Sequence, residues 1–492
     1  MIAQTPISEA ELRHARHALF GFDAIESQNK RKTPTALLRS EDSEATDLDR
    51  RKLNATTRDT RRNFTIAAWM IRMHLAYVCD FKFKGTTENK ALNAKLETIV
   101  NQRSARENFE RTGRHPRLRA MRISEACRTV DGDILQVRLN DRRLQMVEGD
   151  RIRVQNVGDL PSQVDLSKVI HGVITDGAGR ALAYCVNRRL REQLSALSGS
   201  VGAGWFVFER MVKAENAYLH GYFDRADQVR GVSPLTTALN ELRDTYEALD
   251  LARAKLKVSQ LFALAIYRKA VDTDADAPTQ STLEDGTGYQ VDFGRGPTML
   301  DLDPGDDAKI LESGTPAIAS QNFIQLVIAI ALKALDIPYS FYAENFTNYS
   351  GSRGARLDYQ RLAEPKREDN RELLNWWANW QFVVSQMDGE LPGVNLADLR
   401  WTWIASGLPW IDPLKEILAK KEEVALGVNS RTRICAERGF DFEEDILPEL
   451  VREAKLLSDA GLPLNANTDN ALIAAMTQDG PANADSTNQN AA

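Results

Sequence analysis

The stretch 224-DRADQVRGVSPLTTALNELRD-244 decides our expectation for the fold. Its first half is polar and rich in turn-forming residues, whereas its second half has the spacing of a long helix. Ser233 suits the position that caps a helix, and Pro234 suits the first helical position because its missing N–H costs nothing there. No Gly or Pro interrupts residues 235–270. At 1.5 Å per residue the sequence therefore predicts a rod of roughly 54 Å that begins sharply at Ser233.

The apolar residues of this rod follow one side of the predicted helix. Steps of four, three and seven residues separate Leu235, Leu239, Leu242, Tyr246, Leu249, Leu256 and Ala263. This near-heptad spacing indicates packing against other helices. An acidic, turn-rich stretch at 271–288 follows, then strand-like pieces at 289–293 and 298–302 and a second helix near 317–335. We expect a helical hairpin with a small β-containing insert at its tip.

The composition is that of an ordinary globular protein. The 492 residues are 43% hydrophobic and 27% charged, which favours two to four structural units. A net charge of −6 argues against a protein that grips nucleic acid through a basic surface. Four cysteines without a CxxC spacing indicate reduced, packed thiols. Without a signal peptide or a stretch long enough to span a bilayer, we expect a soluble protein made in a reducing cytoplasm, with no membrane partner.

The N-terminal part changes character twice. Residues 1–60 are charged, with sparse hydrophobics, and predict a mobile or partner-dependent arm. Residues 61–112 have a helical pattern, and the segment 64–81 is apolar around much of its circumference, which predicts burial.

A mixed α/β unit is expected over residues 120–232. Alternating runs at 134–139, 168–176 and 181–188 predict strands. The Gly-rich turn 176-DGAGR-180 joins the last two runs as a β-hairpin.

A third long helix is predicted over about 353–387, with a kink at Pro365. Its apolar face indicates core or a subunit interface, and a base-stacking platform is the alternative. That face consists of Leu373, Trp376, Trp377, Trp380, Val383, Val384 and Met387. Residues 400–459 look helical, with Gly427 and Gly439 after helix ends and Asp441 capping the last helix.

The chemistry of the common enzymes is missing from the sequence. It has no phosphate-binding loop, no dinucleotide fingerprint, no nucleophile elbow and no HExxH. His14 and His17 are spaced like metal ligands but have no third ligand nearby. The acidic stretch 301–309 lacks the glycine and closing glutamate of a calcium loop. We therefore expect no cofactor, no metal and no catalytic site; a metal-dependent DNA-acting enzyme that uses scattered carboxylates is the catalytic alternative.

Three motifs together resemble the lambda family of phage portal proteins, in order over about residues 50–455. The run 217-AYLHGYFDRADQVRGVSPL-235 resembles the family's element before a long helix, although Val229 separates Gln228 from Arg230 and Ala226-Asp227 replace the usual Gly. The segments 335-LDIPYSFY-342 and 348-NYSGSRGARLDYQR-361 resemble a second element, and 409–444 resembles a third. Another oligomeric virion protein, such as an adaptor or capsid protein, is the structural alternative.

The resemblance implies a mainly helical α+β portal fold and a ring, typically of twelve subunits, at one capsid vertex of the virion, assembled in the host cytoplasm. It implies an N-terminal arm (1–60), an α/β wing (61–232), two stem helices (233–270 and 313–337), a clip (271–312), a tunnel loop (338–352), a kinked spine helix (353–388), a helical wing or crown region (389–460) and a disordered tail (461–492).

The implied function is a passage for double-stranded DNA during packaging and ejection. The implied partners are non-specific DNA, the terminase large subunit, capsid and scaffold proteins, and head-completion or tail adaptor proteins. The residues expected to face DNA in the tunnel loop are Tyr342, Asn345, Asn348 and Tyr349. Channel cations are expected at Lys255, Lys257 and Lys333, for which exposed lysines on the outer face of the stem are the alternative. Structural roles in the family motif are expected at Gln228, Arg230, Gly231, Ser233 and Pro234.

Overall fold

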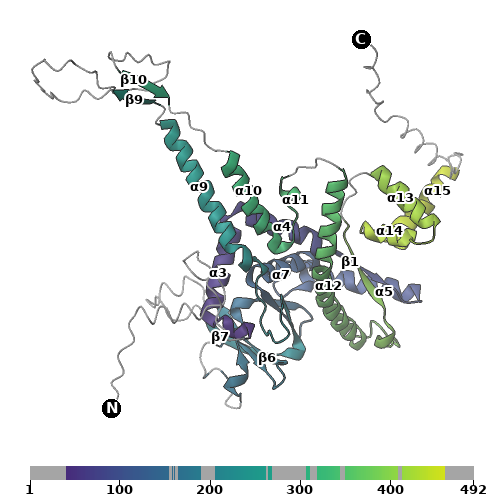
Figure 1. Cartoon of the computed structure of the whole chain (residues 1–492). Helices are drawn as coiled ribbons and strands as arrows, with labels where there is room; N and C mark the ends of the chain where they lie inside the picture. Colours follow the sequence, from purple (N-terminus) through teal and green to yellow (C-terminus); the bar gives the residue numbers. More distant parts are fainter. Residues whose placement is uncertain are drawn as a thin grey trace, which may run out of the picture. The chain divides into compact units, whose positions relative to one another are not determined.

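A computed structural model describes residues 40–154, 158, 160, 164–189, 206–261, 264–268, 306–310, 318–343, 349–407 and 413–459 (Figure 1). The chain divides into two compact units: residues 1–240 with 330–492 form the first, and residues 241–329 form the second. Helices predominate and are combined with small antiparallel sheets, which confirms the predicted mainly helical α+β class. Among the described helices, none has the length and apolar character needed to cross a membrane.

The predicted N-terminal arm is partly wrong. Helix α2 (Glu41–Glu44) precedes helix α3 (Asp47–Asn63), which starts at a capping box formed by Thr46 and Asp49. Two of the charges that suggested a mobile segment have partners within the fold: Arg50 of α3 is buried and donates to the Gly231 carbonyl, and Arg58 pairs with Asp131. The first 39 residues of that arm lie outside the described residues. Helix α4 (Thr65–Val78) follows, and the burial predicted for 64–81 holds for one side of it: Ala67, Met70, Ile71, His74, Tyr77 and Val78 are buried.

Two strands replace helix where the sequence pattern favoured helix. Strand β1 (Phe81–Gly85) pairs antiparallel with β11 (Trp401–Ala405), although more than 300 residues separate them. Phe81 and Phe83 are buried and the intervening side chains are only half-buried, which is the period of two that a strand requires. Helices α5 (Lys90–Ser104), α6 (Arg106–Phe109) and α7 (Arg117–Asp131) follow β1.

Two antiparallel sheets form the predicted α/β part. One has the order β3-β2-β8, and its strands are β2 (Asp133–Arg138), β3 (Leu144–Glu148) and β8 (Ala217–Gly221). The other has the order β4-β5-β6-β7, and its strands are β4 (Val169–Ile170), β5 (Val173–Thr175), β6 (Ala181–Arg189) and β7 (Phe206–Lys213).

The predicted hairpin is confirmed, because β5 and β6 pair antiparallel across 176–180. The run 168–176 is not one strand, however. His171 and Gly172 have φ of 46° and 84°, and this turn folds β4 back onto β5. A Cβ on Gly172 would lie 2.4 Å from the Arg153 backbone, so the turn requires glycine there.

The second unit contains most of the predicted rod and its insert. A 3₁₀ turn (Pro234–Ala238) leads into helix α9 (Leu239–Leu261). Strand β9 (Leu264–Arg268) pairs antiparallel with β10 (Asp306–Ile310), and helix α10 (Ile318–Leu332) returns.

The rod is therefore shorter than predicted, about 35 Å for the 23 residues of α9. The helix was wrongly extended to residue 270 because no Gly or Pro marks its end, yet 264-LAIYR-268 has strand-forming Ile266 and Tyr267. The strand-like pieces expected at 289–293 and 298–302 lie outside the described residues, as does the acidic stretch 271–288.

The C-terminal half is built on one long helix. A 3₁₀ turn (Lys333–Leu335) and helix α11 (Tyr339–Ala343) precede helix α12 (Tyr349–Met387), which includes Pro365. Part of the predicted tunnel loop is thus helical. Helices α13 (Pro413–Ala425) and α14 (Arg431–Glu437), a π-helical turn (Phe442–Ile446) and helix α15 (Leu447–Asp459) end the described chain.

The tryptophans of α12 belong to the core, as expected. Trp377 is buried, and Trp376 and Trp380 pack partly buried against the same cluster. The guanidinium of Arg138 lies 3.9 Å from the Trp376 ring centroid, so that ring face is occupied within the chain. These contacts favour the core interpretation over a base-stacking platform. Met387, at the end of the same apolar face, is 82% exposed.

Candidate functional site

The start of the rod is fixed by one buried arginine. Arg230 donates from Nε and Nη2 to the two carboxylate oxygens of Asp133, at 2.7 and 2.8 Å. Its remaining N–H groups reach the backbone carbonyls of Gly149 (2.8 Å), Ile152 (2.9 Å) and His171 (2.7 Å). All five guanidinium donors therefore have partners although the side chain is almost inaccessible.

A second arginine and a second carboxylate complete this cluster. Arg50 of α3 donates to the Gly231 carbonyl at 2.8 Å and approaches Asp133 at 3.5 Å. Asp42 accepts from the backbone N–H groups of Val229 (2.7 Å) and Arg230 (3.2 Å). Burial alone would raise the pKa of the Asp133 carboxyl, but Arg230 and then Arg50 hold it below its usual value. The cluster is thus a balanced set of two cations and two anions.

Two glycines let the chain pass close to β2 at this point. A Cβ on Gly231 would lie 2.2 Å from the Gly132 carbonyl oxygen, and a Cβ on Gly132 would lie 2.5 Å from the Gly231 carbonyl oxygen. Gly132 also has φ of 91°. No other residue fits either position without moving the backbone.

The remaining motif residues shape the turn and start the helix. The Gln228 side chain accepts from the Asp224 N–H (2.8 Å) and donates to the Arg230 carbonyl (2.8 Å). Ser233 Oγ accepts from the Leu235 N–H, and Pro234 occupies the first helical turn. The predicted cap at Ser233 is therefore confirmed. The five motif residues come together in one buried junction between β2, the N-terminal helices and the start of the rod.

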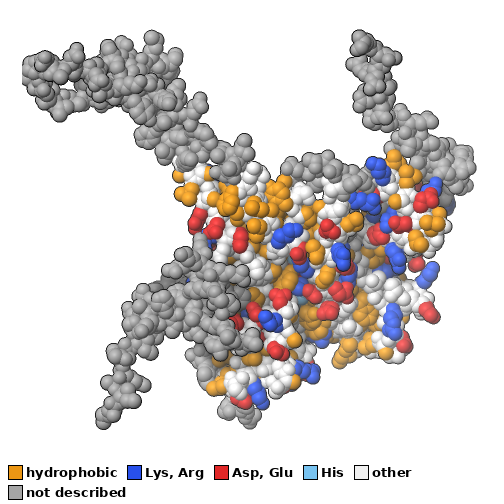
Figure 2. Space-filling view, in the orientation of Figure 1, with side chains coloured by type: hydrophobic (Ala, Val, Ile, Leu, Met, Phe, Trp, Pro, Cys, Tyr) orange, Lys and Arg blue, Asp and Glu red, His pale blue; other side chains and the backbone are white. Residues whose placement is uncertain are grey.

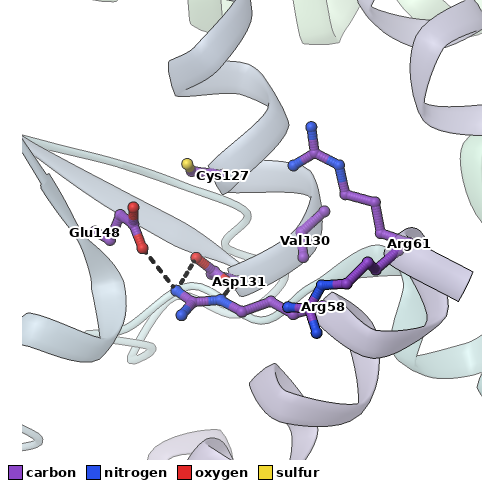
Figure 3. Close-up of a pocket in the computed structure, with 7 residues that line it drawn as sticks. Arg58, Arg61, Cys127, Val130, Asp131 and Glu148 are labelled. Atoms are coloured by element: carbon purple, nitrogen blue, oxygen red, sulfur yellow. Dashed lines mark hydrogen bonds and ion pairs between the residues drawn. The ribbon is translucent and has the colours of Figure 1, made fainter. Parts of the chain in front are cut away.

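A second ion cluster ties α3 to α7 and β3 (Figure 3). Arg58 donates from Nε and Nη2 to both oxygens of Asp131 at 2.6 Å, and Nη2 also reaches Glu148 at 3.1 Å. Asp150 accepts from Nη1 at 3.2 Å. Burial would lower the pKa of Arg58, but Asp131 raises it well above its usual value. The guanidinium is therefore permanently charged.

A third cluster joins α4, α7, β8 and α12. Glu125 accepts from His74 Nε2 at 2.8 Å and lies 3.3 Å from His220 Nε2. Arg128 pairs with Glu125 at 3.2 Å and also with Asp369 of α12. Burial would raise the pKa of Glu125, but Arg128 and the two histidines hold it well below its usual value.

Both histidines are more readily deprotonated than usual. Burial lowers the pKa of His74 and of His220, and Arg128 lowers that of His220 further. We infer an ionised Glu125 that neutral imidazoles and Arg128 surround. Such a set is built to hold four elements together rather than to move a proton.

Of the four predicted DNA-facing residues, the two that the structure describes lie on separate helices. Tyr342 is on α11, and its ring packs edge-on against that of Trp69, at an interplanar angle of 75° and with centroids 5.8 Å apart. Burial raises the pKa of its hydroxyl. Tyr349 is the first residue of α12, whereas Asn345 and Asn348 lie outside the described residues. Tyr342 thus has an ordinary packing role whether or not it faces DNA.

The predicted channel lysines differ in what the structure describes. Lys333 lies in the 3₁₀ turn after α10 and is exposed. Lys255 and Lys257 lie in α9, but their side chains are outside the described set.

No sequence pattern pointed to the junction residues Asp42, Arg50 and Asp133, or to Arg58 of the second ion cluster. The Thr46–Asp49 capping box was the available signal for α3, because its spacing marks a helix start inside a polar stretch. Among the described residues, no three His, Cys, Asp or Glu side chains are grouped as a metal site.

The model of the family described as phage portal protein, lambda family, matches residues 29–367. The chain belongs to this family. The portal protein of Escherichia phage N15 is 21% identical over 472 residues, covering 83% of this chain and 85% of that protein. The portal family is structural rather than enzymatic, and the chain is a portal connector.

Solved structures similar to this portal protein come from gene transfer agent particles. One is the neck of a native particle computed with C12 symmetry (15% identity, TM-score 0.47) and another the neck of an empty particle computed with C6 symmetry (14%, 0.48). The virion of the native particle is a third (14%, 0.45). Each covers 78% of this chain and 93% of the other.

Proposed function

We propose that copies of this portal protein form a ring, typically of twelve, at one capsid vertex, assembled in the host cytoplasm. The ring is the passage for double-stranded DNA during packaging and ejection. The observation that carries the proposal is the family match over residues 29–367, which includes the buried junction and the helices that follow it.

The helices after the junction have the surface that such an assembly needs. On α9, Tyr246 is 49% and Leu251 is 70% exposed; on α10, Phe323 is 61% and Leu326 is 58% exposed. Hydrophobic side chains are visible on α10 and on the described part of α9 (Figure 2). This many exposed apolar side chains on two helices indicate a contact with another protein surface. Stem helices of adjacent subunits are the proposed cover.

The junction gives the proposed stem a fixed origin. Arg230 and Asp133 hold the turn before Ser233 with charge-assisted hydrogen bonds. The backbones at Gly132 and Gly231 lie so close together that a Cβ at either position would clash with the other. The residue at which the helix begins is then set by buried groups. A ring of stems needs this, because a small error repeated in each subunit would prevent closure.

The DNA path is the finer part of the proposal. We assign the tunnel loop to 338–352, with Tyr342, Asn345, Asn348 and Tyr349 toward DNA, and the channel cations to Lys255, Lys257 and Lys333. A passage with few cations keeps phosphate contacts weak, so DNA slides with little friction. Residues 271–312 form the docking face for the terminase large subunit and later for head-completion proteins. Capsid and scaffold proteins contact the outer surface.

The deciding experiment is the mass and symmetry of the purified full-length chain, by light scattering and negative-stain imaging. We expect closed rings of about a dozen 55.0 kDa subunits with a hole as wide as duplex DNA. A chain that stays monomeric with scaffold present, and that cleaves DNA with Mg²⁺ or Mn²⁺, would overturn the proposal in favour of a DNA-acting enzyme.

A further inference from the structure

The net charge of −6 hides an uneven distribution of charge along the chain. From the start of α3 to the end of α7, residues 47–131 contain 19 Lys and Arg but only 10 Asp and Glu. This part therefore carries a net charge of +9, and the rest of the chain carries −15. Of the 19 cations, 14 are arginines. Such an asymmetry between two parts of one chain indicates a polyanionic partner for the basic part.

Five of these arginines surround two adjoining cavities on helices α3, α4 and α7. One cavity of about 350 Å³ is lined by Arg58, Arg61 and Arg62, and one of about 480 Å³ by Arg61, Arg119 and Arg122. The cavities adjoin because Arg61 and Cys127 line both. Figure 3 shows Arg61 extending from α3 on the same side as Cys127 of α7. We call these five arginines the arginine surface.

The carboxylates of this region compensate only two of the five arginines. Arg58 pairs with Asp131 at 2.6 Å and with Glu148 at 3.1 Å, and Arg122 pairs with Asp80 at 2.7 Å. Asp131 and Glu148 are the acidic residues that line the two cavities, so Arg58 occupies both. Arg61, Arg62 and Arg119 are exposed, and none of the three forms an ion pair with a residue that the structure describes. Three guanidinium groups can therefore bind an anion from outside the chain.

Exposed arginines continue beyond the two cavities. Arg106, Arg111 and Arg114 lie in α6 and in the turn that leads to Pro116, which lines the 480 Å³ cavity. All three are exposed and have no ion pair within the described part of the chain. The basic area is thus wider than the cavities. An acidic helix seated in the cavities would contact only the arginines around them, whereas a long polyanion can contact the others as well. The extent of the area therefore favours a long polyanion.

We infer that the arginine surface binds the phosphates of duplex DNA that is not passing through the ring. The planar fork of an arginine matches phosphate oxygens, and phosphate contacts need no particular base sequence. The residues assigned above to the DNA passage are different ones. A passage must also release phosphates easily, whereas uncompensated arginines bind them firmly at low salt. The contact does not require a ring, so it can fail while the proposed function stands.

The test uses a closed circular duplex, because a closed circle cannot thread through a preformed ring. The probe is a labelled minicircle of about 300 bp, roughly two persistence lengths. Filter binding measures its affinity for the full-length chain between about 50 and 200 mM NaCl. We expect the parent to bind at low salt, and R61Q/R62Q/R119Q to bind at least about tenfold more weakly at about 50 mM NaCl. The salt slope should also be smaller in the variant, by at least roughly 2.7, since each phosphate contact contributes about 0.9.

A matched control removes the same number of charges outside the arginine surface. The variant R180Q/R188Q/R431Q replaces three exposed arginines that line neither cavity, and it should bind the minicircle like the parent. Circular dichroism spectra and thermal midpoints show whether each variant is folded. Poly-L-glutamate is the competing probe, because Leu118 and Ile123 also line the 480 Å³ cavity and would suit an acidic protein segment.

Four outcomes overturn the inference. The parent does not retain the minicircle at about 50 mM NaCl; R61Q/R62Q/R119Q binds it like the parent; or the control variant loses as much affinity as R61Q/R62Q/R119Q does. In the fourth, poly-L-glutamate displaces the minicircle as well as unlabelled duplex does at an equal concentration of charge, which assigns the surface to an acidic protein. Light scattering on the same samples reports the oligomer size separately, so rings that form without binding the minicircle leave the proposed function intact.

Discussion

The buried pair of Arg230 and Asp133 carries a prediction at the scale of single residues. Replacing Arg230 by Ala leaves Asp133 inside the fold with Arg50, at 3.5 Å, and the Gly231 N–H as its remaining partners. A buried charge that loses its partner typically costs about 3–5 kcal/mol. We expect Arg230→Ala to reduce the free energy of unfolding by that amount, as measured by urea denaturation.

The control for this prediction is an exposed ion pair. Arg143→Ala removes a pair with Asp141 in which the two side chains are 35% and 42% exposed. Exposed pairs contribute about 0–1 kcal/mol. Equal losses of unfolding free energy in the two variants would show that the buried junction pair contributes no more to stability than an exposed ion pair does.

The close approach of Gly231 to Gly132 carries a second prediction. Gly231→Ala places a Cβ 2.2 Å from a backbone oxygen, which forces two chain segments apart. Overpacking of this kind costs typically about 1–3 kcal/mol, and we expect a matching fall in the thermal midpoint. Gly354→Ala is the control, because a Cβ there meets nothing within 4 Å and Ala favours the helix by about 0.5–1 kcal/mol. A neutral Gly231→Ala would contradict the close packing.

At the scale of elements, the attachment of the C-terminal helices depends on pH. Lys84 of β1 pairs with Asp441 at 3.1 Å and Glu444 at 3.4 Å, and Lys82 pairs with Asp445 at 2.6 Å. Glu97 of α5 lies beside this cluster. Burial and a hydrogen bond to Glu444 raise the pKa of Glu97 to about 7.

A raised carboxyl pKa means that the folded chain holds this proton more tightly than the unfolded chain does. Its contribution to stability is complete below the ordinary pKa of about 4.5 and is lost as pH rises through about 7. We therefore expect the urea midpoint to fall over this window as Glu97 and Glu444 come to repel each other. In Glu97→Gln that decline should be smaller. The difference between the pH curves of the parent and the variant separates the effect of Glu97 from that of histidines that titrate in the same pH range. If the urea midpoints of the parent and of Glu97→Gln change with pH in parallel, then Glu97 does not hold a proton against Glu444 in the folded chain.

The elements that could be predicted from sequence are those with local signals. Ser233-Pro234 marks a helix start, Gly179 marks a hairpin and Gly427 marks a helix end, and each signal lies within a few residues of the feature. The pairing of β1 with β11 has no such signal, because its partners are distant in sequence. Helix α3 was not predicted for a related reason. Its arginines pair with Asp131 and Asp133, which are distant in sequence, so the segment alone has the composition of a solvated arm.

At the scale of the whole molecule, the proposed function depends on which side chains of the ring face the DNA. The tunnel-loop residues Asn345, Asn348 and Tyr349 are assigned to that surface, and their replacement by Ala together should reduce DNA packaging while rings still form. The measurement is the amount of nuclease-protected DNA in capsids assembled with the variant. Protected DNA at the parental level would remove these residues from the mechanism.

Tyr342 needs a separate test, because its ring also packs on Trp69. Tyr342→Ala removes that packing, so it should lower the thermal midpoint of the chain as well as packaging. Tyr342→Phe keeps the ring and removes only the hydroxyl. If the hydroxyl contacts passing phosphates, Tyr342→Phe should lower protected DNA at an unchanged thermal midpoint. If the phenylalanine variant packages normally and only the alanine variant fails, then Tyr342 positions helix α11 and does not touch DNA, and the DNA-facing assignment passes to Tyr349 and its neighbours.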